Sequence, residues 1–199
     1  MTTTVEFFFD VGSPAAYLAW TQLPVLRGEC AAGIELKPML LGGVFQATGN
    51  QSPMMVPAKG SYMQQDLALH AQHYGVPFQH NPHFPINTLT LMRGATALQL
   101  RQPERFADYV DAVFRAIWVD AKDMNDPQVV AAVLGQAGFD AAALLAQAAD
   151  PAVKERLKQL TQEAVARGVF GAPTFFVGDR MFWGQDRLDF VKQALKAPI

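Results

Sequence analysis

The amino-acid sequence predicts an α/β fold in which one mixed β-sheet takes strands from both ends of the chain. Three observations predict it: a strand–helix–strand order near the start, helical patterning over residues 60–167, and two strands followed by a helix at the end. We expect the two flanks to form one sheet, with the block of helices inserted between its halves.

The first flank is predicted to be a strand, a helix and a second strand. Val5–Phe9 is a short β-prone run that ends at a D-V-G turn. Ser13 and Pro14 then begin a helix, with serine as the N-cap and proline in the first helical position. The second strand follows at Ile34–Leu40, where Pro38 indicates an edge strand or an irregular end. Such a unit predicts a parallel strand pair.

The middle of the chain is predicted to be a long loop followed by helices. Residues 42–59 are rich in Gly, Pro, Asn and Met, so we expect a loop, which is either a binding segment or a plain connector. Residues 60–167 are predicted to be helical throughout. The helix after Pro103 has one continuous apolar face, made of Phe106, Tyr109, Val110, Val113, Phe114 and Ile117. Asp126, Asp140 and Asp150 are predicted N-caps of later helices.

The second flank is predicted to be a hairpin and a last helix. Residues 173–177 read P-T-F-F-V, and Gly178-Asp179 is a hairpin turn leading to a second strand at Met181–Trp183. The last helix is expected to begin near Gln185.

Composition excludes several classes of function. Half of the 199 residues are apolar, 17% are charged and the net charge is −2, which describes a folded globular protein without the basic surface that nucleic acid or anionic lipid requires. The N-terminus lacks the pattern of a signal peptide, and no apolar run reaches the roughly 18 residues of a membrane helix. We therefore expect a cytoplasmic protein with no membrane or nucleic-acid partner.

Cysteine and histidine usage give no support for a disulfide or a metal site. Cys30 is the single cysteine, which excludes an intrachain disulfide. The pairs His70/His73 and His80/His83 have a spacing that could hold zinc, but no third ligand accompanies them. We expect surface or capping histidines and no bound metal.

Three short motifs have both a structural and a functional interpretation. Ser13 is an ordinary helix cap, or it marks a helix N-terminus whose N–H groups and hydroxyl stabilise a thiolate. Pro173 begins a strand, or it forms a cis-proline turn that frees the backbone of Ala172 to pair with an extended peptide. The W-G-Q-D-R-L segment from Trp183 is a capped glycine turn, or a site for a ligand with a carboxylate and an ammonium group.

The order and spacing of these motifs resemble the 2-hydroxychromene-2-carboxylate isomerase family. The resemblance is carried by F-D-x-x-S-P-x-x-Y-L, G-x-P-T-F-F-V and W-G-Q-D-R-L, with L-G-G-V-F-Q-A-T-G-N and F-P-I-N-T-L between them. That family belongs with the kappa-class glutathione transferases and, more distantly, the DsbA-type oxidoreductases. The resemblance implies a thioredoxin-like domain formed by residues 1–59 and 168–199, with residues 60–167 as an all-helical insertion domain.

The resemblance also implies a glutathione site. It assigns Ser13 to the glutathione sulfur and Ala172, before a cis-Pro173, to the cysteinyl backbone. The γ-glutamyl end is assigned to one segment, Trp183, Gly184, Gln185 and Asp186. Asn50 and Lys59 match a loop that reaches glutathione in kappa-class relatives. The aromatic substrate is assigned to Phe45, Asn50 and Pro82.

The function implied is a glutathione-dependent isomerase acting on a chromene carboxylate in aromatic hydrocarbon catabolism, and relatives suggest a homodimer. A glutathione transferase or peroxidase on the same site is the alternative enzyme, and a non-catalytic glutathione- or peptide-binding module is the alternative from another class. An ordinary dithiol oxidoreductase is excluded, since Ser13 and Ala16 occupy the two cysteine positions.

Overall fold

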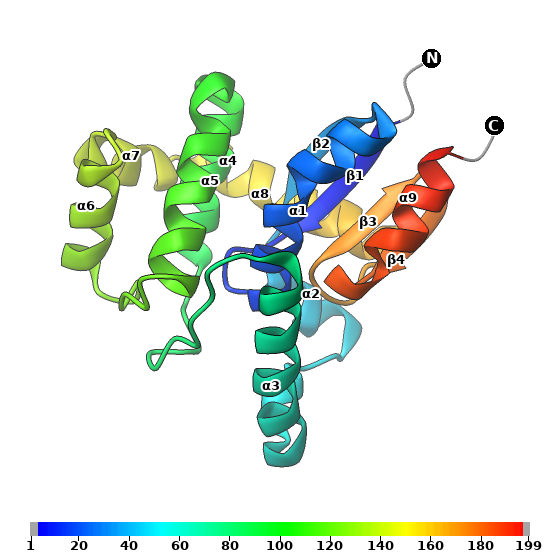
Figure 1. Cartoon of the computed structure of the whole chain (residues 1–199). Helices are drawn as coiled ribbons and strands as arrows, with labels where there is room; N and C mark the ends of the chain where they lie inside the picture. The colour runs from blue at the N-terminus through cyan, green and yellow to red at the C-terminus, as the bar shows by residue number, and fades with distance from the viewer. Residues whose placement is uncertain (1–3, 197–199) are drawn as a thin grey trace.

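The computed structural model describes residues 4–196 and contains a four-stranded sheet in the order β2-β1-β3-β4 (Figure 1). Its strands are β1 (Thr4–Phe9), β2 (Gly33–Pro38), β3 (Thr174–Val177) and β4 (Arg180–Trp183). Strands from the two ends of the chain therefore share one sheet, as the sequence predicts.

The strand register follows the predicted connections. β1 runs parallel to β2 and antiparallel to β3, with Phe7 opposite Leu36 on one side and Phe175 on the other. β3 and β4 form the predicted antiparallel hairpin, which turns at Gly178 with a positive φ of 59°. β2 is an edge strand and ends at Pro38, two residues earlier than expected.

Helices cover both faces of this sheet. They are α1 (Pro14–Cys30), α2 (Leu41–Thr48), α3 (Pro57–Tyr74), α4 (Leu89–Arg101), α5 (Pro103–Trp118), α6 (Pro127–Gln136), α7 (Ala141–Ala148), α8 (Pro151–Ala166) and α9 (Leu188–Lys196), with short 3₁₀ turns η1 (Pro53–Met55) and η2 (Gln185–Arg187). In Figure 1, α1 and α9 lie in front of the sheet and α8 lies behind it. None of the described helices combines the length and apolar composition needed to cross a bilayer.

The helix starts agree with the predicted caps. Asp126, Asp140 and Asp150 each accept a hydrogen bond from a backbone N–H in the first turn of α6, α7 and α8. Since each of these signals lies within four residues of the helix it begins, local sequence was sufficient to find them.

The core lies on both faces of β1, which explains its run of three phenylalanines. Phe7 and Phe9 point to the larger cluster, where they stack on each other. Phe7 also stacks on a ring from β3, and Phe9 lies tilted against a ring from α5. Phe8 points to the opposite face, into a smaller cluster with Phe176 and residues of α2 and α8. All the apolar positions predicted for α5 are buried.

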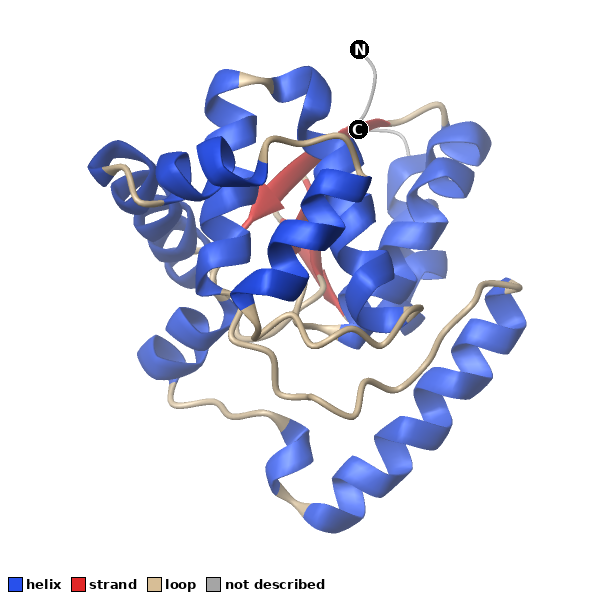
Figure 2. Ribbon diagram, turned by 90° about the vertical axis from the view of Figure 1, so that its left-hand side faces the viewer, coloured by secondary structure: helices blue, strands red, loops and turns tan. Residues whose placement is uncertain are grey.

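Two predicted segments differ from the structure. Residues 42–59 are not a loop, because they contain α2, η1 and the first turn of α3. Residues 60–167 are not helical throughout, since residues 75–88 and 119–126 are extended or turn segments between helices. Figure 2 shows α3 and the turn before it projecting from the body of the molecule. The domain boundary at residues 59 and 60 falls inside α3 and remains a prediction.

The ion pair of Arg167 and Glu6 covers the solvent side of the smaller core cluster. The Arg167 guanidinium donates to both carboxylate oxygens of Glu6 at 2.8 Å and lies 3.8 Å above the ring of Phe176. Lys37 approaches the same carboxylate at 3.6 Å. The hydrogen bonds from Arg167 hold the pKa of Glu6 below its usual 4.5.

We predict that Glu6→Gln lowers the free energy of unfolding by about 1 kcal/mol at neutral pH. A depressed folded-state pKa gives stability that is present above the unfolded pKa and is lost as the pH falls through the folded pKa. Urea denaturation at pH 7 and at about pH 3 measures this, and the difference between wild type and variant should shrink at the lower pH. Glu155→Gln, from a more exposed pair with Lys158, is the control and should change stability by less than about 0.5 kcal/mol. An equal loss at both pH values would contradict the assignment.

Candidate functional site

Ser13 stands where the end of β1 meets the start of α1, and its hydroxyl has two partners. The Oγ atom accepts a hydrogen bond from the N–H of Ala16 at 3.1 Å, which is the predicted N-cap contact. The same hydroxyl donates to the carbonyl oxygen of Ala172 at 3.0 Å, across 159 positions of sequence. Ser13 is 5% exposed, so this is a defined contact in a nearly buried site.

The second motif contacts Ser13 through the backbone carbonyl of Ala172. The peptide bond between Ala172 and Pro173 is cis, as the sequence predicts, and β3 begins at the next residue. Within residues 4–196, the N–H of Ala172 donates to no protein acceptor. A free backbone donor therefore lies next to the carbonyl that receives the Ser13 hydroxyl.

The third motif is joined to the second. The carbonyl oxygen of Pro173 accepts a hydrogen bond from the N–H of Gly184 at 3.0 Å. The Trp183 indole packs 4.9 Å from the ring of Phe170 and covers Gly171, where an added Cβ would lie 2.6 Å from the indole nitrogen. Because 48% of Trp183 is exposed, the indole forms an open aromatic wall over Gly171, the residue before Ala172.

The turn after Trp183 is tightly folded. Gly184 has a φ of 107°, a backbone conformation that residues with a Cβ rarely adopt, so this position favours glycine. An added Cβ there would also clash with the carboxylate of Asp186 unless that side chain moved. Asp186 is exposed and forms an ion pair with Arg187. The buried Gln185 presents its carbonyl oxygen to the hydroxyl of Tyr74, 3.0 Å away.

Tyr74 is a residue that the sequence analysis missed. It ends α3 in the helical region, and burial raises its pKa to about 12, so the hydroxyl stays protonated and donates. Tyr74, Gln185 and Asp186 line a polar hollow of about 290 Å³ between α1, α3 and α9. No local signal marks Tyr74, because its partner lies 111 positions away.

The remaining predicted residues are more scattered. The Asn50 amide, just after α2, donates to the carbonyl oxygen of Phe170 at 2.8 Å and so joins the cluster. Phe45 is partly buried on α2. Lys59 is exposed in the first turn of α3, and Pro82 is exposed between α3 and α4. In the described part of the chain, neither of these two forms a hydrogen bond or ion pair with the other predicted site residues.

Asp10 stands in the F-D-x-x-S-P motif, three residues before Ser13, but the sequence assigned it no role. Its carboxyl is 1% exposed and accepts hydrogen bonds from Gly12, Leu41 and Thr88. Burial raises its pKa, although these three hydrogen bonds oppose the rise. The available signal was its place in the F-D-x-x-S-P motif, directly after the apolar strand and just before the helix cap.

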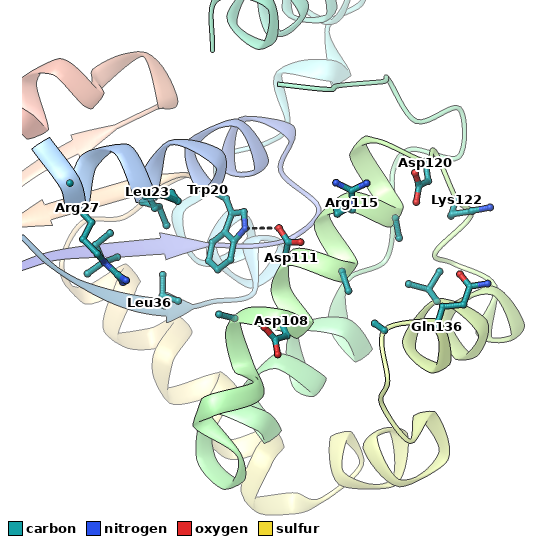
Figure 3. A pocket seen from close by; sticks show the side chains of 18 residues that line it. Trp20, Leu23, Arg27, Leu36, Asp108, Asp111, Arg115, Asp120, Lys122 and Gln136 are labelled. Atoms are coloured by element: carbon teal, nitrogen blue, oxygen red, sulfur yellow. Dashed lines mark hydrogen bonds between the residues drawn. The ribbon is translucent and has the colours of Figure 1, made fainter. Parts of the chain in front are cut away.

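A larger hollow lies elsewhere. A groove of about 900 Å³ runs between α1, α5 and the edge strand β2, with the indole of Trp20 donating to Asp111 at 3.3 Å (Figure 3). Its charged side chains, which include Arg27 and Arg115, lie exposed along its rim. None of the predicted site residues lines it, so cavity size alone does not mark the site. Across residues 4–196, no three His, Cys, Asp or Glu side chains are grouped to hold a metal ion.

Comparison with known proteins identifies the family. Residues 4–196 match the family described as "DSBA-like thioredoxin domain". The chain belongs to that family. A 2-hydroxychromene-2-carboxylate isomerase from Sphingobium xenophagum is 35% identical over 98% of this chain and 99% of its own length. Glutathione S-transferase kappa 1 from Homo sapiens is 31% identical over 96% of this chain and 90% of its own length.

Solved structures agree with this DSBA-like assignment. The structure of a 2-hydroxychromene-2-carboxylate isomerase superposes with a TM-score of 0.85 at 32% identity, covering 96% of this chain and 94% of that one. The family resemblance and the thioredoxin-like fold with a helical insertion are thus confirmed. Because the relatives that match over nearly their full length are isomerases and transferases, this chain is an enzyme.

Proposed function

We propose that this enzyme is a glutathione-dependent isomerase that converts 2-hydroxychromene-2-carboxylate to trans-o-hydroxybenzylidenepyruvate. The observation that carries the proposal is the contact of the Ser13 hydroxyl with Ala172. It places a hydroxyl donor, a helix N-terminus and a free backbone N–H at one point, which a thiol and its own peptide backbone can occupy together. The identity to named isomerases over the whole chain supports the choice of substrate.

Bound glutathione would replace the hydrogen bond between Ser13 and Ala172 with hydrogen bonds to its own sulfur and backbone. The N–H of Ala172 donates to the cysteinyl carbonyl, while the Ser13 hydroxyl turns from the Ala172 carbonyl to the sulfur. The Ala172 carbonyl, released from Ser13, then accepts from the cysteinyl N–H, as in the pairing of an added strand. Trp183 to Asp186 hold the γ-glutamyl end, with the exposed Asp186 carboxylate facing its ammonium group.

The Ser13 hydroxyl is the main stabiliser of the thiolate in this proposal. A free thiol has a pKa of about 8.5, and lowering it by two units takes roughly 2.7 kcal/mol. Pro14 has no N–H and the N–H of Ala16 is bound to Ser13, which leaves Ala15 as the open donor of the first turn. The helix dipole supplies about 0.3–1 kcal/mol, or up to ~2 when partly buried. A hydroxyl hydrogen bond to a charged sulfur adds roughly 1.5–3 kcal/mol, which completes the shift.

The reaction uses the thiolate as a temporary nucleophile. Ring opening of the chromene gives a cis enone, and the thiolate adds to its β-carbon as the π electrons move to the carbonyl oxygen. The former double bond is now single and rotates. Return of the electrons expels the thiolate and leaves the trans isomer with glutathione unchanged, so one difficult rotation becomes several easier steps.

Several finer assignments rest on the family resemblance and are proposed on that basis. Asn50 would contact both glutathione and substrate, which its hydrogen bond to Phe170 favours. Lys59 would contact glutathione, and Phe45 and Pro82 the aromatic substrate. We also propose a cytoplasmic homodimer, in keeping with the resemblance.

A kappa-like transferase or peroxidase is the second candidate, favoured by the match to glutathione S-transferase kappa 1. The test is to incubate the enzyme with purified 2-hydroxychromene-2-carboxylate and glutathione, and to follow the trans product and free thiol together. Isomerisation that requires glutathione but consumes none supports the proposal. Stoichiometric loss of thiol with an electrophile or a peroxide, without isomerisation, indicates the transferase or peroxidase. Binding of glutathione without any turnover indicates a non-catalytic module.

We predict that Ser13→Ala lowers kcat/KM by about ten- to a hundred-fold at neutral pH, the loss of roughly 1.5–3 kcal/mol. The apparent pKa in the kcat/KM profile should rise by about one to two units, since the thiolate loses its donor. The measurement is the pH dependence of kcat/KM for the chromene carboxylate, with each variant saturated in glutathione.

Asp140→Ala is the matched control, because Asp140 caps α7 through the same contact with the third residue of the helix. It should lose a similar stability without a change in the pH profile. If Ser13→Ala shows only what Asp140→Ala shows, Ser13 is a helix cap and nothing more.

We predict that Tyr74→Phe weakens glutathione binding about three- to tenfold, since it removes one hydrogen bond, worth about 0.5–1.5 kcal/mol, from the turn that holds the γ-glutamyl end. At saturating glutathione kcat should stay unchanged, because the sulfur site is untouched. Calorimetry and saturation kinetics measure the two quantities. Tyr62→Phe, on the exposed side of the same helix, is the control and should change neither. A loss of kcat with unchanged binding would contradict this role.

A further inference from the structure

Three segments around the candidate site converge on one buried carboxyl, that of Asp10. One carboxylate oxygen accepts the N–H of Gly12 at 2.9 Å, in the turn before Ser13. The other accepts the N–H of Leu41 at 2.8 Å, at the start of α2, and the hydroxyl of Thr88 at 3.0 Å, at the N-cap of α4.

The backbone of Asp10 reaches Ser13 directly. Its carbonyl oxygen accepts a hydrogen bond from the N–H of Ser13 at 3.0 Å. Asp10 therefore forms hydrogen bonds within the turn through its main chain, to Ser13, and through its side chain, to Gly12. The turn is also packed closely: a Cβ added at Gly12 would lie 2.8 Å from the methyl of Thr88. Gly12 therefore packs directly against Thr88, at the N-cap of α4.

The chemistry of this contact requires two acceptor oxygens. The N–H groups of Gly12 and Leu41 are fixed donors that approach different oxygens, so an asparagine would oppose its amide N–H to one of them. Only the Thr88 hydroxyl can rotate. Asp10 forms no ion pair in the part of the chain that the structure describes, and burial raises its pKa. Its role is therefore that of a hydrogen-bond acceptor and not of a charge partner.

We propose that Asp10 is a positioning residue for Ser13. Its carboxyl ties the Asp10–Ser13 turn to the starts of α2 and α4, and this holds the Ser13 hydroxyl in place for the sulfur of glutathione. The effect on catalysis rests on the proposed function. The positioning of Ser13 by Asp10 rests only on the hydrogen bonds described above.

The most informative variant is Thr88→Val, which deletes one hydroxyl and keeps the shape of the side chain. We expect a several-fold lower kcat/KM and a raised apparent pKa in its pH profile, with binding of S-methylglutathione unchanged because that thioether needs no thiolate site. Thr88→Ser restores the hydroxyl and should return the pKa toward that of wild type. Asp10→Asn should produce a larger change of the same kind if it folds.

The control is Thr96→Val in the same helix. Thr96 is fully buried and its hydroxyl donates to the carbonyl of Met92. The variant removes an equivalent buried hydroxyl without touching Asp10. It should lower the melting temperature and leave the pH profile unchanged. If Thr88→Val behaves like Thr96→Val, Asp10 only supports the fold and the proposal is overturned.

Amide hydrogen exchange tests the same inference without glutathione. In Thr88→Val the amides of Ser13 and Leu41 should exchange about three- to tenfold faster, and in Thr96→Val they should not. Unchanged exchange overturns the positioning role, whatever the enzyme does with glutathione. Absence of glutathione-dependent turnover in the wild type would instead count against the proposed function, so the two failures are distinguishable.

Discussion

The antiparallel pairing of β1 with β3 is the constraint on which the rest of the structure depends. It sets Phe7 opposite Phe175 and Phe8 opposite Thr174, and the stacked rings of the first pair lie in the main core. Because the strands run in opposite directions, the end of β1 lies beside the start of β3. Ser13 and Ala172 are thereby brought within one hydrogen bond, although the whole helical insertion separates them in sequence. The site therefore forms only when both halves of the sheet are in register.

Much of the fold could be predicted because its signals are local. Both faces of β1 are covered, so its three phenylalanines form a continuous apolar run that is recognisable as such. The caps at Ser13 and Asp126 directly precede their helices. α2 was missed because its start is stabilised by tertiary contacts and not by a local cap. Leu40 supplies no side-chain cap, and the N–H groups of Leu40 and Leu41 donate to the side chains of Thr161 and Asp10, which are distant in sequence. A helix containing two adjacent glycines has low intrinsic propensity, and packing against α8 compensates for it.

The candidate site could be predicted in its motifs but not in its supports. Ser13, Ala172 and Trp183 stand in motifs whose order carries the family resemblance. The structure joins these motifs through the hydrogen bond from the Ser13 hydroxyl to the Ala172 carbonyl and the backbone hydrogen bond from Gly184 to Pro173. Tyr74 supports the third motif through a contact with a segment 111 positions away, so it could not be recognised from spacing. Asp10 stands within the first motif, but its partners Leu41 and Thr88 lie on distant segments, so its role as a buried acceptor could not be predicted. Lys59 and Pro82 were assigned by the resemblance alone, and the structure leaves both exposed on other segments.

We propose that the protein ionises the thiol of bound glutathione through Ser13 and the start of α1. The most direct measurement is the ultraviolet absorbance of the thiolate, recorded against pH for glutathione bound to the wild-type protein. We expect the bound thiol to have a pKa at least about one unit below the value near 8.5 of a free thiol. A bound thiol that titrates at the same pH as glutathione in solution, under conditions where calorimetry shows the site to be saturated, would contradict it.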